Sequence, residues 1–518
     1  MSSAARKSFW LMAGLVAALV VLVAGHDLYW QRKVAVYRAE LKARGESLSI
    51  DEVIDHFPLA AYSAGKIFQG MVGKSPDDLI LPGGMRLVAP GRAVVVHRLA
   101  NIWTSGNKTG RAWEELGAQV EAMRPSLVAL GKALEPEQIA NRIDYSLGFN
   151  ALLPQLADMK GLSLRFSCAT VADLNRGDFP GALANLLAGL HLPKAIAEDH
   201  FMISELVRIA ISAITFPAVW ETMQSPECDD SALARIAAAC KSAGYFAAII
   251  RSLELERAIN LDAFKTMRRS HSARMEMITR LTGDGLPAPP PPAANFGGFS
   301  QGKTSVLNYL RDFSGRIGLG ARSLAWRWLW SGEDEYYFLR MIQAMIDSGR
   351  DGLKQHSLKS CQGRDGQIAR DLQRLTGNKL RDRFLFTRNI LPAWRDAFGK
   401  AAGIEVQKQL VLAAIAIRRH EFRHGRLPEA LDGLVPEFLS EVPRDWMDGM
   451  SLRYRPGTNG QFLLYSVGRD FKDGGGDGSM MDENKSARSI LLGKDIVWPV
   501  PATPEEIAEA TKASKSRR

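Results

Sequence analysis

The clearest hydrophobic pattern in the chain is an uncharged run at residues 8–25. At about 18 residues, the run is just long enough to cross a bilayer as a helix. Arg6 and Lys7 precede it, and these cations favour a cytoplasmic N-terminus with the rest of the chain outside the cytoplasm. The aromatic and polar residues 27–30 follow like an interfacial belt. The pattern therefore predicts one transmembrane anchor, and a cleaved signal peptide is the alternative.

Helical periodicity dominates the chain beyond the anchor. Its clearest case is residues 162–175 followed by 181–192, in which Asp178 can cap the second helix and Pro180 suits its first turn. This pair resembles one tetratricopeptide hairpin, but no period of about 34 residues extends it into an array. Ser49 and Glu52 form a predicted capping box. Further helices are predicted at 31–44, 111–134, 136–156, 230–244, 245–267, 305–317, 322–330, 334–348 and 384–400, and a strand at 93–96.

A proline-rich stretch at 286–298 gives the best internal boundary, because its backbone must be extended. The predicted fold class is mainly α, with a helical-hairpin, tetratricopeptide-like body and a small C-terminal α+β module. The predicted divisions are a cytoplasmic N-terminus (1–7), an anchor (8–25), an N-terminal helical region (26–160), a helical-hairpin domain (161–285), a Pro/Gly-rich linker (286–302), a second helical region (303–400), the α+β module (401–501) and a basic tail (502–518).

Composition narrows the function classes. Hydrophobic residues make up 46% and charged residues 24%, which is typical of a globular chain. The net charge of +10 is spread along the sequence rather than gathered into a binding motif, so we expect no nucleic-acid partner. The four cysteines contain no CxxC pair, so neither a disulfide framework nor a thiolate metal site is expected.

Aromatic residues gather at 326–338, including Trp326, Trp328 and Trp330. Such a cluster is typical either of packing between helices or of a membrane interface. Packing is the more common explanation, and both interpretations stay open at this point.

Two short motifs match known catalytic patterns in their residue types and spacing. Residues 297–304 match GxxxxGK[ST], but a polyproline run precedes them where a phosphate-binding loop needs a central strand. His420, Glu421 and His424 match HExxH, which on a helix could bind zinc with Glu421 as the general base. Against zinc, Gly425 sits at a helix C-cap position, so the helix is predicted to end at His424. Glu437 and Glu441 are third-ligand candidates only by their distance in sequence.

The C-terminal stretch resembles the globular part of type II secretion major pseudopilins and related type IV pilin-like proteins. The resemblance rests on a long helix ending in residues 424–428 (HGRLP), the Ser-x-Gly-x-Asp segment at 466–470 and residues 495–498 (DIVW). It implies a small antiparallel sheet and a calcium-binding loop. A pseudopilin has its hydrophobic helix directly before this module, whereas residues 26–400 intervene here. The whole chain resembles uncharacterised membrane-anchored proteins of planctomycete and verrucomicrobial bacteria.

The Asp/Gly-rich loop is the predicted metal site. Calcium prefers six to eight oxygen ligands on a flexible loop, and Asp470, Asp473, Asp477 and Asp482 offer carboxylates. The pseudopilin resemblance favours Asp470 and Asp495 as ligands. We therefore predict Asp470, Asp473, Asp477 and Asp495 as calcium ligands, with a solvated turn that binds no metal as the alternative. Calcium is the only cofactor that the favoured interpretation of the sequence allows for.

These observations predict a non-catalytic scaffold or interaction protein of a bacterial inner membrane. Its single anchor would hold most of the chain in the periplasm, where protein partners of a secretion or pilus-type machine are expected. No catalytic residue is assigned. One alternative is a zinc-dependent peptidase using His420, Glu421 and His424. Another is a calcium-stabilised exported protein that binds lipid or glycan.

Overall fold

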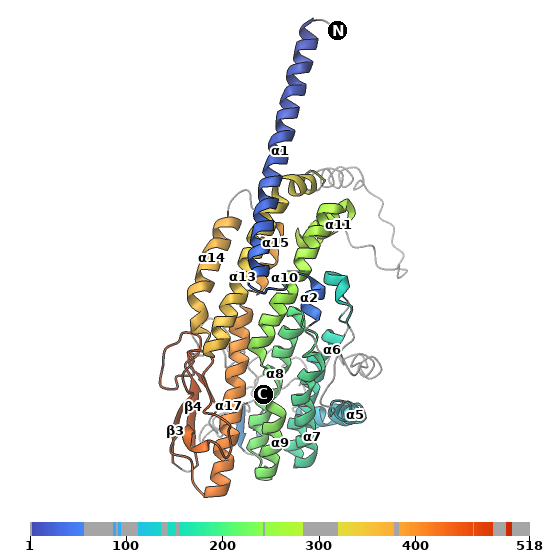
Figure 1. The fold of residues 1–518 in the computed structure, drawn as a ribbon. Coiled ribbons are helices and arrows are strands. Elements are labelled where there is room, and N and C mark those ends of the chain that lie inside the picture. Colours follow the sequence, from blue (N-terminus) through green and yellow to red (C-terminus); the bar gives the residue numbers. More distant parts are fainter. Residues whose placement is uncertain are drawn as a thin grey trace, which may run out of the picture. The chain divides into compact units, whose positions relative to one another are not determined.

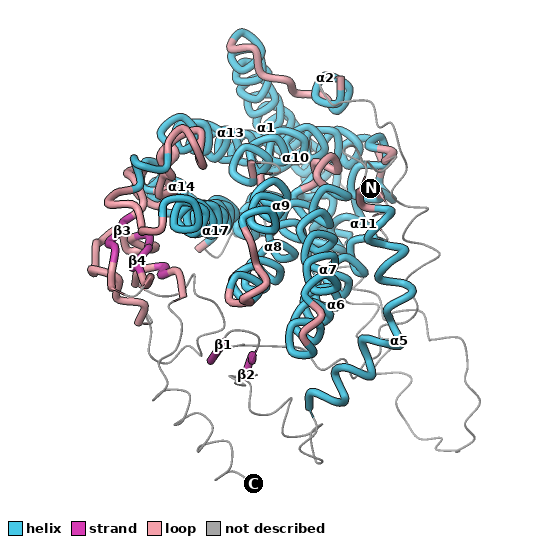
Figure 2. The backbone as a smooth tube through the Cα atoms, turned by 90° about the horizontal axis from the view of Figure 1, so that it is seen from below, coloured by secondary structure: helices cyan, strands magenta, loops and turns pink. Residues whose placement is uncertain are grey.

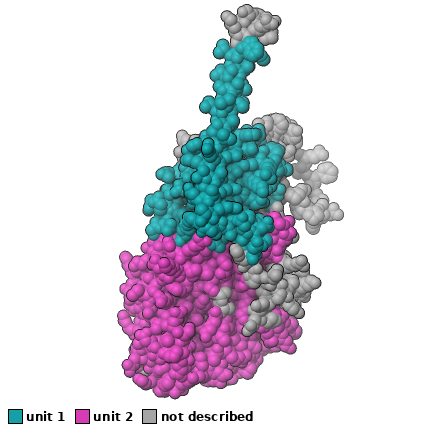
Figure 3. Space-filling view, in the orientation of Figure 1, with its two compact units in different colours: residues 1–56, 253–347, 363–395 teal, residues 57–252, 348–362, 396–518 magenta. Residues whose placement is uncertain are grey.

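The protein is mainly helical with few strands (Figure 1). Its computed structural model describes residues 3–55, 86–89, 92–94, 112–135, 143–151, 153, 155–241, 244–282, 320–377, 383–394, 396–458, 460–479 and 494–499. The chain divides into two compact units, which Figure 3 colours separately. Unit 1 comprises Met1–His56, Leu253–Asp347 and Gly363–Arg395, and unit 2 comprises Phe57–Ser252, Ser348–Gln362 and Asp396–Arg518. Each unit therefore joins segments that are far apart in the sequence.

Unit 1 is built around the long helix α1. Its elements are α1 (Ser3–Ala43), α2 (Ile50–Ile54), most of α10 (Tyr245–Arg269), α11 (His271–Thr282), a helical stretch at 320–325, the π-helix η3 (Trp326–Trp330), most of α13 (Ser331–Gln355), α14 (Gln362–Thr376), α15 (Leu385–Asn389) and α16 (Leu391–Trp394).

The predicted anchor and the predicted helix after it form one continuous helix, α1. The chain leaves this helix at Gly45, whose φ of +81° is a conformation that favours glycine. Ser49 then caps α2: its side chain accepts the N–H of Glu52, and the Glu52 side chain accepts the N–H of Ser49. The capping box is therefore confirmed.

Residues 320–355 are helical throughout and pass through the π-helix η3. The buried side chain of Asp334 holds this region in place. Its carboxylate accepts the indole N–H of Trp326 at 3.1 Å and the backbone N–H groups of Phe386 and Thr387 at 3.0 and 3.1 Å. Burial raises the pKa of Asp334 to about 6. One acidic side chain thus ties the start of α13 to the start of α15.

Unit 2 holds the helical hairpins and both sheets. Its elements are β1 (Arg86–Ala89), β2 (Arg92–Val94), α5 (Ala112–Ala133), the 3-10 helix η1 (Tyr145–Asn150), α6 (Gln155–Arg176), α7 (Phe179–His191), η2 (Leu192–Ile196), α8 (Met202–Met223), α9 (Asp230–Cys240), the start of α10, η4 (Lys359–Cys361), α17 (Ala397–His424), η6 (Leu431–Leu434), β3 (Arg453–Pro456), β4 (Phe462–Ser466) and β5 (Ile496–Val497).

Helices α6, α7, α8 and α9 pack side by side, with α5 against α6 (Figure 2). Asp178 is the N-cap of α7, because its carboxylate accepts the N–H of Gly181 at 3.0 Å. The buried residues Leu162, Phe166 and Leu192 belong to the hydrophobic core of this group. The predicted helical hairpin and its cap are confirmed, whereas its likeness to a tetratricopeptide unit stays a prediction.

Two predicted helices are wrong in their extent. Residues 145–150 form a 3-10 helix rather than part of a helix at 136–156, because Gly148 adopts a non-helical φ of 50°. Residues 384–400 do not form one helix: α15, α16 and the start of α17 divide the stretch. In the second stretch the divided backbone buries Phe384, Leu385 and Phe386, whereas Leu147 in the first stretch stays 49% exposed.

The C-terminal module combines α17 with a three-stranded antiparallel sheet of order β3-β4-β5. Tyr454 pairs with Leu464, and Ser466 pairs with Ile496. Helix α17 ends at His424, and Gly425 follows in the left-handed conformation with a φ of 70°, as the sequence predicts. Predictions for the linker at 286–302, the motif at 297–304, Asp482 and the tail at 502–518 lie outside the described residues.

Candidate functional site

The N-terminal half of α1 presents apolar side chains to the outside. Trp10 is 71% exposed and Leu22 is 70% exposed, and the run between them carries no charge. Soluble proteins rarely leave a contiguous apolar surface of this kind uncovered. About 20 helical residues cross the roughly 30 Å of a hydrocarbon core, so a span that starts at Ser8 ends near Asp27.

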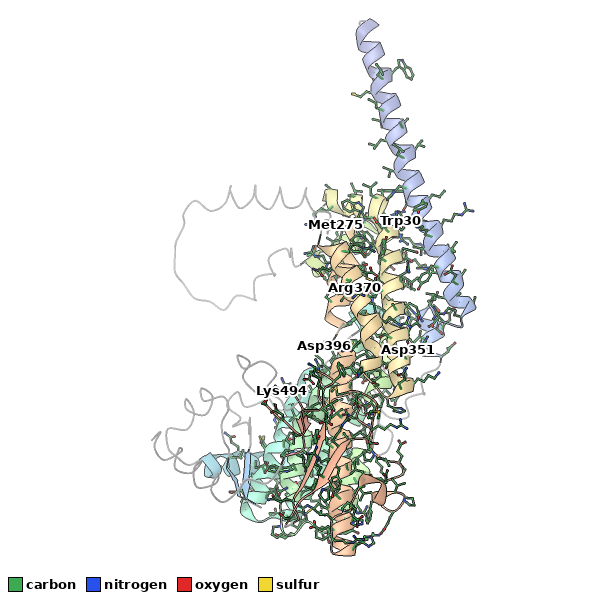
Figure 4. The ribbon with its side chains drawn as sticks, turned by 90° about the vertical axis from the view of Figure 1, so that its left-hand side faces the viewer. Trp30, Met275, Asp351, Arg370, Asp396 and Lys494 are labelled. Carbon is green, nitrogen blue, oxygen red and sulfur yellow. The ribbon has the colours of Figure 1, made fainter. Side chains whose placement is uncertain are left out.

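The C-terminal half of α1 is packed into unit 1. Val34 and Leu41 are buried, and the Trp30 ring lies 5.7 Å from Tyr336 and 5.9 Å from Tyr337, centre to centre. Figure 4 labels Trp30 at this position on α1. One continuous helix therefore has a bare half and a docked half, which divide near Asp27.

Ion pairs fix the docked half. Arg38 pairs with the fully buried Glu335, which also pairs with Arg268 at 2.5 Å. Arg44 donates to both carboxylate oxygens of Asp347 at 3.1 Å. Burial removes water from the Glu335 carboxylate, and its ion pairs with two arginines offset that desolvation cost.

A buried polar cluster continues this attachment just beyond α1. Glu46 accepts hydrogen bonds from Arg257 and from Gln343, both at 3.0 Å, and Arg257 also donates to the Ser47 carbonyl at 2.8 Å. Sequence reasoning missed this cluster, since its members come from three distant segments.

Within the described residues, three helices are long and apolar enough to cross a membrane, by length and composition alone. They are Phe9–Ala43, whose most apolar window is 0% buried, Met202–Met223 at 61% and the combined stretch Asp230–Arg269 at 56%. The last two bury more than half of that window inside the protein. The helix that contains the predicted anchor is the one that leaves it bare.

Asp495, one of the four predicted calcium ligands, is buried and organises the Asp/Gly-rich loop. Its Oδ2 accepts the N–H groups of Gly476 and Asp477 at 2.8 Å, and its Oδ1 accepts that of Gly474 at 3.3 Å. The loop folds around this carboxylate because three backbone N–H groups converge on it. Both oxygens of Asp495 therefore already accept hydrogen bonds from the backbone.

The other three predicted ligands are dispersed along the loop. Asp470 accepts the N–H of Lys472, Asp473 accepts the Tyr465 hydroxyl and the N–H of Gly475, and Asp477 pairs with Lys494 at 3.1 Å. Figure 4 labels Lys494 beside this part of the fold. Among the described residues, no group of three or more His, Cys, Asp or Glu side chains is arranged to hold a metal ion.

Asp445 is the buried acid that holds the sheet to the rest of the module. It accepts the Ser466 hydroxyl at 2.7 Å, the N–H of Val467 at 2.9 Å and Arg453 Nη1 at 2.9 Å. Asp445 was not singled out from the sequence. Its position directly before a Trp in a turn was the available indication of a structural carboxylate.

The HExxH residues lie on α17 but point to different partners. His420 and His424 have ring centres 4.5 Å apart, and His424 Nε2 donates to Glu437 at 3.2 Å. Glu421 instead accepts from Arg418 at 2.5 Å. The Glu437 carboxylate also accepts from Arg423 at 3.1 Å. Of the two histidines, only His424 contacts Glu437, whereas His420 Nδ1 donates to the Arg426 carbonyl at 2.9 Å. The intended general base Glu421 is engaged by an arginine.

A second polar cluster in unit 2 also escaped the sequence prediction. Arg208 pairs with Glu205 at 2.6 Å and stacks 4.5 Å above the Tyr245 ring, whose hydroxyl lies 2.6 Å from the Ser212 hydroxyl. Glu405 accepts the Tyr245 N–H and pairs with Lys408, both at 2.5 Å. These buried charges neutralise one another, which is typical of an interior that holds helices in register rather than of a site open to substrate.

Comparison with protein-family models, with curated proteins and with solved structures gives no match for the chain.

Proposed function

We propose that this chain is a single-pass, membrane-anchored scaffold or interaction protein of a bacterial envelope. One observation carries the proposal: α1 is a continuous helix that is bare and apolar over its first half and ion-paired into unit 1 over its second. The continuous helix and its tight docking also favour a retained anchor over a cleaved signal peptide. The body would lie on the periplasmic side of the inner membrane, because Arg6 and Lys7 precede the span.

The other two apolar helices are better explained as core helices. Helix α8 carries Glu205, Arg208 and Glu221, all buried within the protein. A charged side chain at the centre of a bilayer costs about 2.5–3.5 kcal/mol even on the mildest scale. Helix α10 places Arg257 in the buried cluster with Glu46. Both helices are therefore assigned to the body.

Two cavities described in unit 2 are small, which fits the proposed binding or scaffolding role. These cavities, lined in part by Ser212 and Tyr245 and by Trp220 and Trp498, have volumes of about 10 and 20 Å³. Each has room for about one water molecule. The HExxH alternative gains no support from its geometry, because Glu421 faces Arg418. An envelope assembly of the secretion or pilus type is the proposed partner class, on the resemblance of residues 401–501.

A pair of topology reporters tests the orientation. An enzyme that is active only outside the cytoplasm, fused after residue 518, is expected to be active. The matched fusion before residue 8 is expected to be inactive. The reverse pattern would contradict the proposed topology.

A zinc measurement separates the scaffold from the peptidase. Purified full-length protein is expected to hold no stoichiometric zinc, and His424→Ala is expected to leave its metal content unchanged. Zinc at one equivalent in the wild type, lost in His424→Ala, would overturn the scaffold proposal in favour of the peptidase.

A further inference from the structure

Helical residues 320–330 carry an apolar face that the protein leaves uncovered. Leu324 is 53% exposed and Trp328 is 49% exposed, and they lie four residues apart on one side of the helix. Ala321 and Ala325 complete the same face at helical spacing. A helix that faced water on this side would carry polar residues there.

The opposite face of this segment is firmly anchored. Trp326 is buried and donates its indole N–H to Asp334 at 3.1 Å, and its ring stacks on Phe264 with centres 5.9 Å apart. Ser323 accepts from Arg274 at 2.8 Å. Residues two apart on a helix project to nearly opposite sides, so fixing Trp326 inward fixes Trp328 outward. The exposure of Trp328 is therefore imposed by the fold.

The sequence left two interpretations of the aromatic cluster at 326–338 open, packing between helices or a membrane interface. In the structure some of its rings are packed and others are exposed. Trp326 and Phe338 are buried in the core of unit 1. Tyr336 and Tyr337 pack on Trp30. Packing thus accounts for these four rings, and it leaves Trp328, which is exposed, and Trp330, which is half-buried.

The position of Trp328 along α1 indicates what covers it. His26 Nε2 donates to the Leu329 carbonyl at 3.0 Å, and Asp27 pairs with Arg327 at 3.7 Å. Figure 1 shows the yellow segment beside α1 at the level where α1 becomes bare. A span that starts at Ser8 reaches the edge of the hydrocarbon core about 20 residues later, which is Asp27. Leu329 and its neighbour Trp328 therefore lie at the depth of the lipid–water boundary.

The side chains on the exposed face of residues 320–330 are of types that suit the lipid–water boundary. Tryptophan is enriched at membrane interfaces, where its ring is amphipathic, and arginine extends its charge toward headgroup phosphates. The Arg327 guanidinium lies 4.3 Å from the Trp328 ring centre, and its Nε donates to the Arg268 carbonyl at 2.9 Å. An apolar helix face that exposes a tryptophan is typical of a helix that lies in the interface plane.

We propose that residues 320–330 lie in the lipid–water interface, with Leu324 and Trp328 inserted between the headgroups. The inference rests on the proposed anchoring of α1 and adds a second attachment to the same leaflet. One helix alone leaves the body free to tilt and rotate about the anchor. A second apolar contact at the base of α1 would hold unit 1 at a fixed orientation to the membrane surface.

Nitroxide labels in the full-length protein test this contact. Single cysteines replace Trp328, Leu324, Leu15 and Phe422, and each variant is labelled and reconstituted into vesicles of neutral and anionic phospholipid. Phe422, on α17 in unit 2, is the matched control because it is an exposed aromatic residue at 58%. The four native cysteines are buried, and burial raises the pKa of Cys228 and Cys240 to about 12, so they react poorly with the label.

Collision with oxygen and with a water-soluble nickel complex reports the depth of each label. We expect Leu15 deep in the hydrocarbon, Phe422 in water, and Trp328 and Leu324 between them with at least a several-fold lower nickel accessibility than Phe422. Labels at 328 and 324 that match Phe422, while Leu15 is immersed, would overturn this inference and leave the anchor intact. Labels shielded from both reagents would show a protein cover instead of lipid and would equally overturn it. A water-accessible Leu15 would instead refute the anchor.

Discussion

At the scale of single residues, buried carboxylates connect segments of the chain that are distant in the sequence. Glu46, Asp334, Asp445 and Asp495 each accept hydrogen bonds from segments that are distant in the sequence. A buried acid without such partners would be strongly destabilising, so each of these side chains specifies which segments must meet. None of the four carries the pattern of a catalytic pair.

Asp334 should give the protein a pH-dependent stability. Burial raises the pKa of Asp334 to about 6 in the folded protein, above its ordinary value of 3.8. Between those two values the folded state binds more protons than the unfolded state, so the free energy of unfolding falls as the pH rises from about 4 to about 6. Asp334→Asn removes this decline, which is on the order of 2–3 kcal/mol. Urea unfolding in detergent at several pH values measures it.

Thr387→Val is the matched control for that experiment. It removes the hydroxyl that donates to Asp334 at 2.8 Å but keeps the carboxyl group itself. The variant should be less stable by about 1 kcal/mol yet retain the fall in stability between pH 4 and 6. An Asp334→Asn protein with the same pH slope as the wild type would show that Asp334 is not the group responsible.

Replacing Asp495 by alanine should lower the free energy of unfolding much more than replacing Asp470. Asp495→Ala leaves three backbone N–H groups without their acceptor and should lower the free energy of unfolding by about 2 kcal/mol. Asp470→Ala removes a bond within one turn and should stay within about 0.5 kcal/mol of the wild type. Thermal unfolding without calcium compares the two, and equal effects would contradict the organising role of Asp495.

Calcium binding by the Asp/Gly-rich loop remains a prediction from the sequence. If calcium binds, the predicted ligands are Asp470, Asp473, Asp477 and Asp495, each of which already accepts at least one hydrogen bond. Millimolar calcium is then expected to raise the melting temperature of the wild type and to have no effect on Asp470→Ala. An unchanged melting temperature in the wild type would refute calcium binding.

At the scale of elements, local patterns in the sequence predicted where helices begin and end. Ser49 and Asp178 act as N-caps and Gly425 ends α17, as predicted, because caps depend on one or two neighbouring residues. The helices predicted at 136–156 and 384–400 were wrong in extent, since Gly148 is non-helical within 145–150 and α15, α16 and α17 divide the second stretch. The continuity of α1 across residue 26 was also missed, because the polar group at 26–27 resembled a break.

The candidate site was less predictable than the elements. The apolar run in α1 was evident from its composition, but its docked half depends on Arg38 meeting Glu335 and Glu46 meeting Arg257. Pairs so far apart leave no periodic trace in one sequence. The outward position of Trp328 likewise follows from the inward anchoring of Trp326 by Asp334.

Gly332 should control how closely α1 approaches α13. A Cβ atom at Gly332 would lie 2.8 Å from the Trp30 Cβ and 3.4 Å from the Gln31 backbone nitrogen. Neither atom is the far end of a flexible side chain, so Gly332→Ala should push the helices apart. We expect a loss of about 1–3 kcal/mol in the free energy of unfolding in detergent.

Gly363→Ala is the matched control, because a Cβ there meets no heavy atom within 4 Å on α14 of the same unit. It should be neutral or stabilise the protein by up to about 1 kcal/mol. If Gly332→Ala behaved like Gly363→Ala, the close docking of α1 on α13 would be wrong.

At the scale of the whole molecule, the account assigns α1 two environments. In the proposed arrangement its first half contacts lipid and residues 320–330 lie at the lipid–water boundary, while its second half is part of unit 1. Because α1 is one continuous helix across that boundary, it would hold unit 1 at a fixed height above the membrane surface. A scaffold that presents partner surfaces at a defined height above a membrane needs that rigidity.

The most direct test of the account is flotation of the full-length protein with phospholipid vesicles after alkaline carbonate washing. The comparison is between the wild type and the double variant Leu15→Arg, Leu19→Arg, whose two charges would lie near the bilayer centre at about 2.5–3.5 kcal/mol each. Both side chains are exposed, so the body should keep its fold, which circular dichroism checks. The account predicts that the wild type floats and that the folded variant stays at the bottom of the gradient. A wild type that stays at the bottom, or a folded variant that floats equally well, would contradict it.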